Sequence, residues 1–283
     1  MPRHLVQRAD QELFGLSFKR HSYHWPIIGY EKDLANMTAS EALGFYRAHY
    51  SPNHATVVIV GDVDPDRVFQ VVRKHYESIA PSDKGPSFGP LMDGPQKSAR
   101  RKALPLNIQV EKILVGYPIP KFLNKDTAAL QMIQAVLTSG NSSRLYRALV
   151  ETGIASSVDT FDLDSKDPGL LVFAVNLQKG RKADEAEAVI LREAAQLATQ
   201  ALSKTELERA RNKLSYDYFD ALSSNFMKAM FLGHYETVAG SFEEGILHHR
   251  KVQGLSAEEI KKVAKRYLLP DTRNVIIGVP KKS

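Results

Sequence analysis

Two stretches of the sequence, about 218 residues apart, have the same order of helix, turn and apolar strand. The first is TASEALGFYRAHYSPNHATVVIVG (Thr38–Gly61) and the second is SAEEIKKVAKRYLLPDTRNVIIG (Ser256–Gly278). Each begins with a hydroxyl residue followed three positions later by Glu, then has a Tyr and a Pro, and ends in β-branched residues and a Gly. The nearly constant offset indicates a duplicated unit, which limits the chain to folds built from two similar halves.

The repeat also bears on the length of the two units. A unit of about 217 residues that ends at Gly278 fits inside the chain, but the copy that ends at Gly61 would begin before residue 1. We therefore expect the end of a first unit followed by a complete second unit. The length of 283 residues and the 43% apolar content are those of a soluble globular chain with about two domains.

The charge and hydropathy of the chain exclude two classes of partner. A formal net charge of +6 would suit a nucleic acid, but the basic runs Lys97–Lys102 and Lys261–Arg266 are short and contain no aromatic residue for base stacking. We interpret the basic residues as solvated helix faces and predict no nucleic-acid partner. No stretch approaches the ~20 consecutive apolar residues of a membrane span, so no membrane partner is predicted.

The first repeat opens with a helix. Thr38 and Glu41 have the spacing of a capping box, in which both side chains satisfy backbone N–H groups that the first helical turn leaves open. The helix is predicted to run to about Tyr50, with Leu43 and Tyr46 on its core face.

A strand and a second helix follow. Ala55–Val60 is a continuous β-branched, apolar run, which is the pattern of a strand buried on both faces of a sheet. Asp64 and Pro65 then predict a helix start, because Asp caps the first turn and the missing N–H of Pro costs nothing there. The core face of this helix is predicted to consist of Val68, Val71, Val72 and Tyr76.

A change of composition suggests the domain boundary. Between Pro81 and Arg101, four prolines alternate with three glycines and no apolar period remains, which is typical of an interdomain linker. We predict a remnant of the first domain over residues 1–80, a linker over 81–104 and a second domain over 105–283.

The second domain has the elements of a layered α+β fold. We predict a strand over Asn107–Pro118, helices over Asp126–Leu137 and Ser142–Glu151, and a hairpin of Ile154–Phe161 with Leu170–Leu177. Four more helical patterns precede the final strand: Lys182–Ala201, Thr205–Leu222, Asn225–Val238 and Phe242–Gln253. This order predicts a two-layer α/β sandwich, with a mainly antiparallel sheet and helices on one face.

The common catalytic motifs do not occur in the sequence. There is no Cys, no His-x-x-Glu-His, no Gly-x-Ser-x-Gly and no phosphate-binding Gly-rich loop. The paired histidines lie in loops or diverge on a helix, so we interpret them as surface or capping residues: His21 and His24, His49 and His54, His248 and His249. We predict no catalytic, cofactor-binding or metal-binding residue, and no cofactor, in this chain.

The sequence resembles the pitrilysin-like, or insulinase-like, zinc metallopeptidases, which include the mitochondrial processing peptidases and bacterial zinc proteases. The resemblance covers essentially the whole chain. It rests on LANMTASEALGFYRAHYSPNHATVVIVGDVDPDRV, SGNSSRLYRALVETGIASSV and LSAEEIKKVAKRYLLPDTRNVIIGVP. It implies two homologous α/β domains that are joined by a linker and enclose a peptide-binding chamber, and it makes this chain similar to the C-terminal portion of a bacterial zinc protease.

The sequence departs from the family pattern at the zinc site. Family peptidases carry an inverted zinc motif, His-x-x-Glu-His, and a downstream Glu ligand in the first domain, upstream of the region that matches residues 1–61. This chain contains neither. The resemblance therefore assigns zinc to the full-length parent and leaves open whether this chain is an enzyme.

A second departure concerns the groups that hold substrate. Active family members supply an Arg and a Tyr from the second domain, which are thought to stabilise the transition-state oxyanion. In LVETGIASSV, Val150 falls at the Arg position and Ser156 or Ser157 at the Tyr position. Nearby Arg and Tyr side chains match the family's structural helix and are not assigned to the pair: Arg144, Tyr146 and Arg147.

Together these features predict a chain that is catalytically silent on its own and forms half of a substrate chamber. The sheet edge near Ile154–Phe161 would bind an extended peptide or unfolded protein by strand addition. The resemblance implies a homologous partner subunit that supplies the Arg/Tyr pair, and it suggests the bacterial periplasm. The alternative is a natural non-catalytic scaffold subunit of the same fold, like the core subunits of respiratory complexes.

Overall fold

The computed structural model describes residues 3–82, 91–161 and 163–281, with side chains from Arg8 onward. Contacts between residues divide the chain into two compact units. Unit 1 comprises Met1–Trp25, Met92–Tyr218 and Ile246–Ser283, and unit 2 comprises Pro26–Leu91 and Phe219–Gly245. This division follows contacts rather than sequence duplication, so the boundaries predicted at residues 80 and 105 stay predictions.

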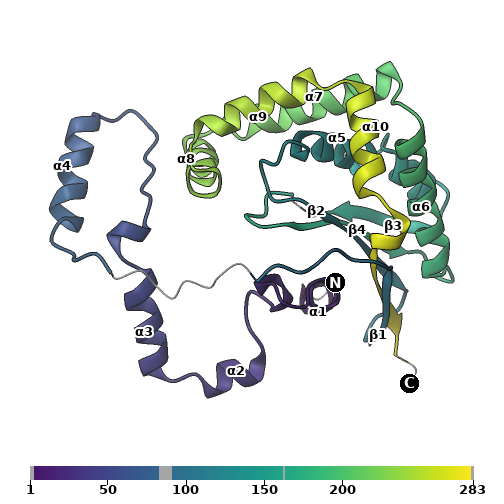
Figure 1. Ribbon diagram of the computed structural model, residues 1–283, viewed down its shortest axis with the longest axis horizontal. Helices are drawn as coiled ribbons and strands as arrows, with labels where there is room; N and C mark the ends of the chain where they lie inside the picture. Colours follow the sequence, from purple (N-terminus) through teal and green to yellow (C-terminus); the bar gives the residue numbers. More distant parts are fainter. Residues whose placement is uncertain (1–2, 83–90, 162, 282–283) are drawn as a thin grey trace. The chain divides into compact units, whose positions relative to one another are not determined.

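Unit 1 is organised around a five-stranded sheet with the order β1-β5-β2-β4-β3 (Figure 1). The parallel pair is β1 with β5, and the other three pairs are antiparallel. The predicted hairpin is confirmed as β3 and β4, and the sheet is mixed rather than purely antiparallel. The strands are β1 (Arg100–Leu106), β2 (Lys112–Ile119), β3 (Ala155–Thr160), β4 (Gly169–Leu177) and β5 (Asn274–Pro280).

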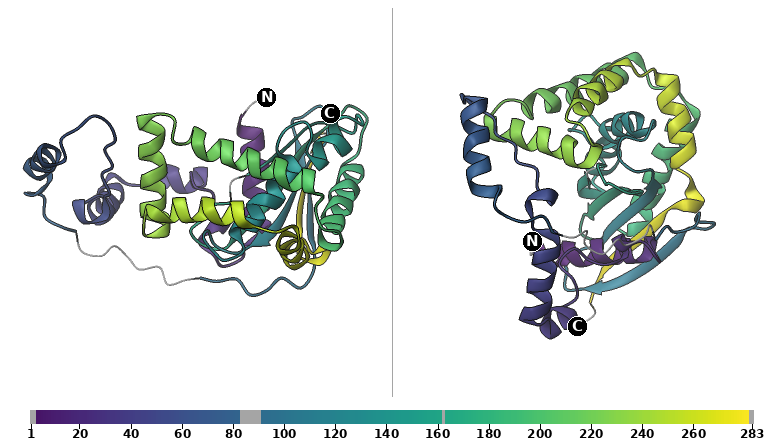
Figure 2. Two further views of the ribbon diagram at one scale, coloured as in Figure 1. Left: turned by 90° about the horizontal axis from the view of Figure 1, so that it is seen from above. Right: turned by 60° about the vertical axis from the view of Figure 1, so that its left-hand side comes forward.

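A layer of helices covers one face of this sheet (Figure 1, Figure 2). It contains α5 (Thr127–Thr138), α6 (Ala183–Thr199) and α10 (Ala257–Tyr267). Three side chains of β2 lie in the core beneath it and are fully buried: Ile113, Val115 and Tyr117. Alternate residues of a strand point to one face, so this spacing accounts for one half of the burial of β2.

Helix α1 (Arg3–Ser17) lies on the opposite face of the sheet (Figure 1). Its Ala9 and Leu13 form a second core with residues of three strands: Leu114, Val172 and Ile276. Gly116 of β2 lies beneath this helix. A Cβ atom at Gly116 would lie 3.4 Å from Cδ2 of Leu13. The predicted arrangement of helices on one face thus describes α5, α6 and α10, whereas α1 covers the second face.

The predicted linker is partly ordered against α1. Residues 83–90 lie outside the described residues, and β1 begins at Arg100, inside the predicted linker. The Asp93 carboxylate accepts the backbone N–H groups of Lys19 and Arg20 at 3.0 Å. The Arg100 guanidinium donates to the backbone carbonyl of Ser17 at 2.7 Å. These bonds satisfy backbone groups at and just after the C-terminal end of α1 and connect it to residues 93–100 of the same unit.

Unit 2 contains α2 (Glu31–Asn36), α3 (Ala39–His49) and α4 (Pro65–Tyr76). The predicted helix starts are confirmed here. Thr38 and Glu41 form a complete capping box at the start of α3. Asp64 caps α4 by accepting the N–H groups of Asp66 and Arg67, with Pro65 at the first helical position.

The other helices and turns of the described residues are as follows. None of the helices in these residues has the length and apolar character needed to cross a membrane. The α-helices are α7 (Lys204–Asp220), α8 (Asn225–His234) and α9 (Glu243–Gly254), with π-helical turns at η3 (Tyr146–Val150) and η4 (Tyr235–Ala239). Short 3-10 turns are η1 (Ser22–His24), η2 (Pro52–His54) and η5 (Pro270–Thr272).

The predicted buried strand at Ala55–Val60 is wrong. The segment follows η2 and forms neither a helix nor a strand ladder. No strand of the described residues pairs with it. Val57 is 55% exposed and Ile59 is 48% exposed. An apolar run is buried only where neighbouring strands and helices cover it, and the described residues of unit 2 supply no second strand. Helix residues predicted to lie in the core are exposed for the same reason: Leu43, Tyr46, Val71 and Tyr76.

Docking of α1 predicts a measurable stability difference. Leu13→Ala removes a fully buried side chain and should lower the free energy of unfolding by about 2–5 kcal/mol, because it leaves a cavity between α1 and the sheet. Leu247→Ala on α9 is the matched control, since Leu247 is half-exposed and its loss should change stability by less than about 0.5 kcal/mol. Urea unfolding followed by circular dichroism measures both, and equal effects would show that α1 is not docked.

Candidate functional site

The candidate site is the edge of the sheet formed by η3 and β3. The family resemblance implies that this segment contains the positions at which active members carry an Arg and a Tyr. β3 is the last strand in the sheet order, so no described strand pairs with its outer edge. An edge strand presents a row of backbone N–H and C=O groups that can pair with another chain. A register shift between Ala155 and Ser157 places Ser156 in an irregular position of the ladder.

The side chains at the Arg and Tyr positions contact the core and the neighbouring strand β4. Val150 is half-buried and packs against the core beneath the helical layer. The Ser156 hydroxyl donates to the backbone carbonyl of Asn176 at 3.2 Å. The Ser157 hydroxyl accepts from the Asn176 side chain at 2.7 Å. At these positions a ligand would meet the backbone of the edge strand. The side chains of Val150, Ser156 and Ser157 provide neither the guanidinium group of an Arg nor the phenol group of a Tyr.

Three nearby residues were not assigned to the Arg/Tyr pair: Arg144, Tyr146 and Arg147. Two of them, Arg144 and Tyr146, contact other parts of the domain. Arg144 donates from Nε to Oε1 of Glu206 at 2.7 Å. Burial raises the pKa of Glu206, but hydrogen bonds from Arg144 and Ser203 outweigh it and lower the pKa to about 2. Tyr146 packs against the core, whereas Arg147 is exposed. Arg144 thus links η3 to the start of α7 in this structure.

The described residues contain no group of three or more His, Asp or Glu side chains that could hold a metal ion. His21 is the N-cap of η1, where its Nδ1 accepts the backbone N–H of Tyr23 at 3.1 Å. Nδ1 of His49 lies 3.0 Å from the backbone oxygen of Phe45, one turn earlier in α3. The contact of His21 fits a capping role, although this residue is buried at 6% exposure, and the contact of His49 fits the interpretation as a capping or surface residue.

His248 differs from that interpretation. It is buried, at 7% exposure, and its Nε2 lies 2.8 Å from Oε1 of Gln131 on α5. Burial lowers the pKa of His248 to about 4, so the ring is neutral near pH 7. The prediction of a surface role was wrong because adjacent residues of a helix point in different directions, and the sequence does not say which of His248 and His249 faces inward.

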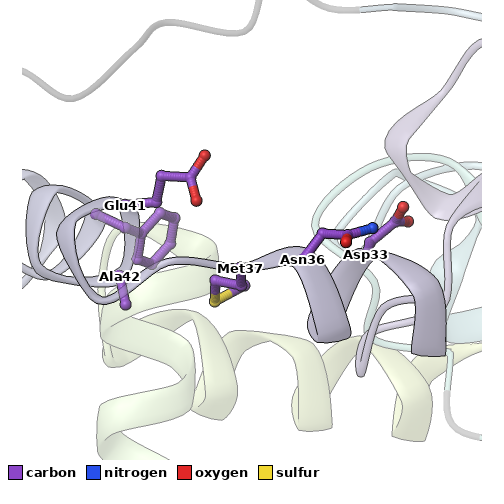
Figure 3. Close-up of a pocket in the computed structure, with 6 residues that line it drawn as sticks. Asp33, Asn36, Met37, Glu41 and Ala42 are labelled. Atoms are coloured by element: carbon purple, nitrogen blue, oxygen red, sulfur yellow. The ribbon is translucent and has the colours of Figure 1, made fainter.

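A hollow of about 660 Å³ lies between α2 and α3 in unit 2 (Figure 3). Its lining residues are all exposed: Asp33, Asn36, Met37, Glu41, Ala42 and Phe45. The two carboxylates come from different helices and lie at opposite ends of the row of side chains in Figure 3. That of Glu41 already accepts the backbone N–H and hydroxyl of Thr38, at 2.8 and 2.7 Å. No sequence pattern indicated this hollow, and its polar groups do not converge on a ligand.

The fold is a layered α/β domain, and its candidate site is the outer edge of strand β3. Residues 36–214 match the family model described as the peptidase M16 inactive domain. The chain belongs to this family. The resemblance stated from the sequence is thereby confirmed, and the description of the matching domain as inactive agrees with a chain that lacks the zinc motif.

A curated zinc protease is similar in sequence to nearly the whole of this chain. Zinc protease PqqE of Helicobacter pylori is 26% identical over 267 residues, which are 93% of this chain and 60% of the relative. The chain thus spans about three fifths of this curated relative.

Solved structures show the same fold. A protease from Helicobacter pylori has a TM-score of 0.91 at 24% identity, covering 97% of this chain and 67% of the other. A chain of complex III2 from Candida albicans has a TM-score of 0.79 at 14% identity, covering 96% and 66%.

The buried His248 predicts a pH dependence of stability. Below about pH 6.5 the unfolded chain binds a proton at this residue, while the folded chain binds it only near pH 4. The free energy of unfolding should therefore fall as the pH is lowered from about 6.5 to about 4, by roughly 3 kcal/mol from this residue. His248→Gln should flatten that part of the curve in urea titrations, whereas His54→Gln, an exposed control, should not. Parallel curves for the wild type and His248→Gln would contradict the assignment.

Proposed function

We propose that this chain forms one part of the peptide-binding chamber of a zinc metalloendopeptidase and is catalytically silent on its own. The observation that carries the proposal is the outer edge of β3, which no described strand covers. This edge lies in the segment where active family members hold substrate. In this chain the segment contains Val150, Ser156 and Ser157 instead of the Arg/Tyr pair.

The geometry supports binding rather than bond cleavage. An extended peptide that pairs with β3 gains backbone hydrogen bonds regardless of its sequence, so the substrate class is an extended peptide or unfolded protein. The exposed side chains of Ser156 and Asp159 would lie beside it. Water activation and oxyanion stabilisation would come from outside this chain: zinc from the full-length parent, and the Arg/Tyr pair from a homologous partner subunit.

β3 suits this role better than the other edge strand. β1 carries Arg100, Arg101 and Lys102 in succession, and Pro105 has no N–H to donate. Charged residues and Pro on an edge strand discourage pairing with another chain. The two edges of one sheet therefore provide a test of the proposal with an internal control.

A second candidate is a natural non-catalytic scaffold subunit. The fold shared with a chain of complex III2 from Candida albicans favours it, because that similarity extends over nearly the whole of this chain. A scaffold of this kind would use its surfaces for stable assembly and would not bind peptides along β3. A measurement of peptide binding at β3 therefore separates the two candidates.

Photo-crosslinking tests the proposed peptide edge. With p-benzoylphenylalanine in place of Ser156, the chain should crosslink to a labelled, unstructured peptide, because this exposed position lies on the edge that pairs with it. With the same residue in place of Ala103, an exposed position on β1, no crosslink is expected. Crosslinking is read by gel electrophoresis and mass spectrometry.

Equal crosslinking at positions 156 and 103, or none at either, would contradict the role of β3. The unmodified chain provides a second measurement. Zinc analysis should find no stoichiometric metal, and the unstructured peptide should remain intact after incubation. Stoichiometric zinc together with EDTA-sensitive cleavage by the isolated chain would contradict catalytic silence.

A further inference from the structure

Unit 1 contains a cavity of about 200 Å³ at one end of its sheet. The cavity lies where α1 and η1 meet the end of β2 and the beginning of β4, and residues 92–96, which precede β1, form a further wall. None of the described lining residues belongs to η3 or β3. The cavity is therefore separate from the proposed peptide edge.

The walls of the cavity are largely apolar. Three hydrophobic side chains of the wall are buried: Phe18, Ile119 and Leu170. Three prolines add rigid surfaces: Pro95, Pro118 and Pro168. Sites for small molecules typically combine such walls with a few polar groups that fix the orientation of the ligand. Since an apolar cavity of about 150 Å³ can hold benzene, this cavity has room for one ring with a small polar substituent.

Arg100 gives the cavity wall a cationic group with unused hydrogen-bond donors. Nη1 of its partly buried side chain donates to the backbone carbonyls of Leu16 and Ser17, at 2.9 and 2.7 Å. Nε and Nη2 have no partner among the described residues. The two bonds from Nη1 hold the guanidinium plane in place. A guanidinium fixed in this way can bind a carboxylate through two parallel hydrogen bonds.

The acidic group of the cavity wall is already occupied. The Asp93 carboxylate accepts the backbone N–H groups of Lys19, Arg20 and His21 at 3.0–3.3 Å. Successive backbone N–H groups form a concavity that stabilises an anion, so they offset much of the negative charge of Asp93. The wall group that keeps both a full charge and unused donors is therefore Arg100, and it favours an anionic ligand.

We infer that this cavity binds a small carboxylic acid with a single apolar ring. The carboxylate pairs with Nε and Nη2 of Arg100, and the ring lies among Phe18, Pro118 and Leu170. The cavity walls shield the ion pair from water, which strengthens it relative to a pair on the open surface. Burial of the ring adds a hydrophobic contribution. The inference does not involve β3, and it holds whether or not that edge binds a peptide.

Benzoate is the probe for this inference, because it combines one ring with a carboxylate. An NMR titration of the 283-residue chain should show saturable binding with a Kd of about 1 mM or lower. Intermolecular NOEs should connect the ring protons of benzoate to the methyl groups of Met92, Ile119 and Leu170. Benzamidine has the same ring and the opposite charge, so its Kd should be ~10-fold higher or more.

A pair of variants tests the role of Arg100. Arg100→Gln should raise the Kd for benzoate ~10-fold or more, because the charge and the two-bond contact are lost. Arg101→Gln is the matched control and should leave the Kd unchanged. Arg101 is the next residue of β1, but it pairs with Asp184 and Glu187 of α6 and does not line the cavity. Circular dichroism checks that both variants are folded.

Three results would overturn the inference. One is the absence of saturable benzoate binding up to ~10 mM, and another is a set of NOEs that all involve residues outside the cavity. The third is equal affinity for benzoate and benzamidine, or an equal Kd for benzoate in the Arg100→Gln and Arg101→Gln variants. If Arg100→Gln does not fold, the NOEs and the benzamidine comparison on the unmodified chain still decide the question.

Discussion

The burial of β2 on both faces is the constraint on which unit 1 depends. β2 is the middle strand of the sheet, and seven of its eight residues are buried. Ile113, Val115 and Tyr117 need the helical layer of α5, α6 and α10. Leu114 needs a cover on the opposite face, which α1 provides. A strand that is apolar on both sides therefore requires helices on both sides.

The same requirement explains why the two copies of the repeat differ. In unit 1 the helix and strand of the repeat, α10 and β5, are enclosed by two neighbouring strands and two helices. In unit 2 the corresponding residues have the same caps and turn, but no sheet surrounds them in the part of the chain that the structure describes. Local sequence thus decides the shape of the element, whereas burial depends on which other elements are present to cover it.

The limits of sequence analysis follow from this distinction. Helix starts at Thr38 and Asp64 were predictable, because capping uses residues within one turn. The β3–β4 hairpin was predictable from its two apolar runs and polar turn. β1 was not, because it is basic, contains Pro105, and buries only Leu104 and Leu106. The assignment of Val150 and Ser156 or Ser157 to the Arg and Tyr positions stays a prediction from the resemblance. The edge position of β3 depends on sheet order, which local patterns do not determine.

Native-state hydrogen exchange on the 283-residue chain tests the central claim most directly. The claim is that the chain holds one completed sheet and an uncovered copy of its closing helix and strand. Amides of β2 and β5 should exchange slowest, through opening of the whole of unit 1. Amides of Thr56–Val60 should exchange near the rate of an unfolded chain, because they have no ladder partner among the described residues. Protection of Thr56–Val60 comparable to that of β5 would contradict the account.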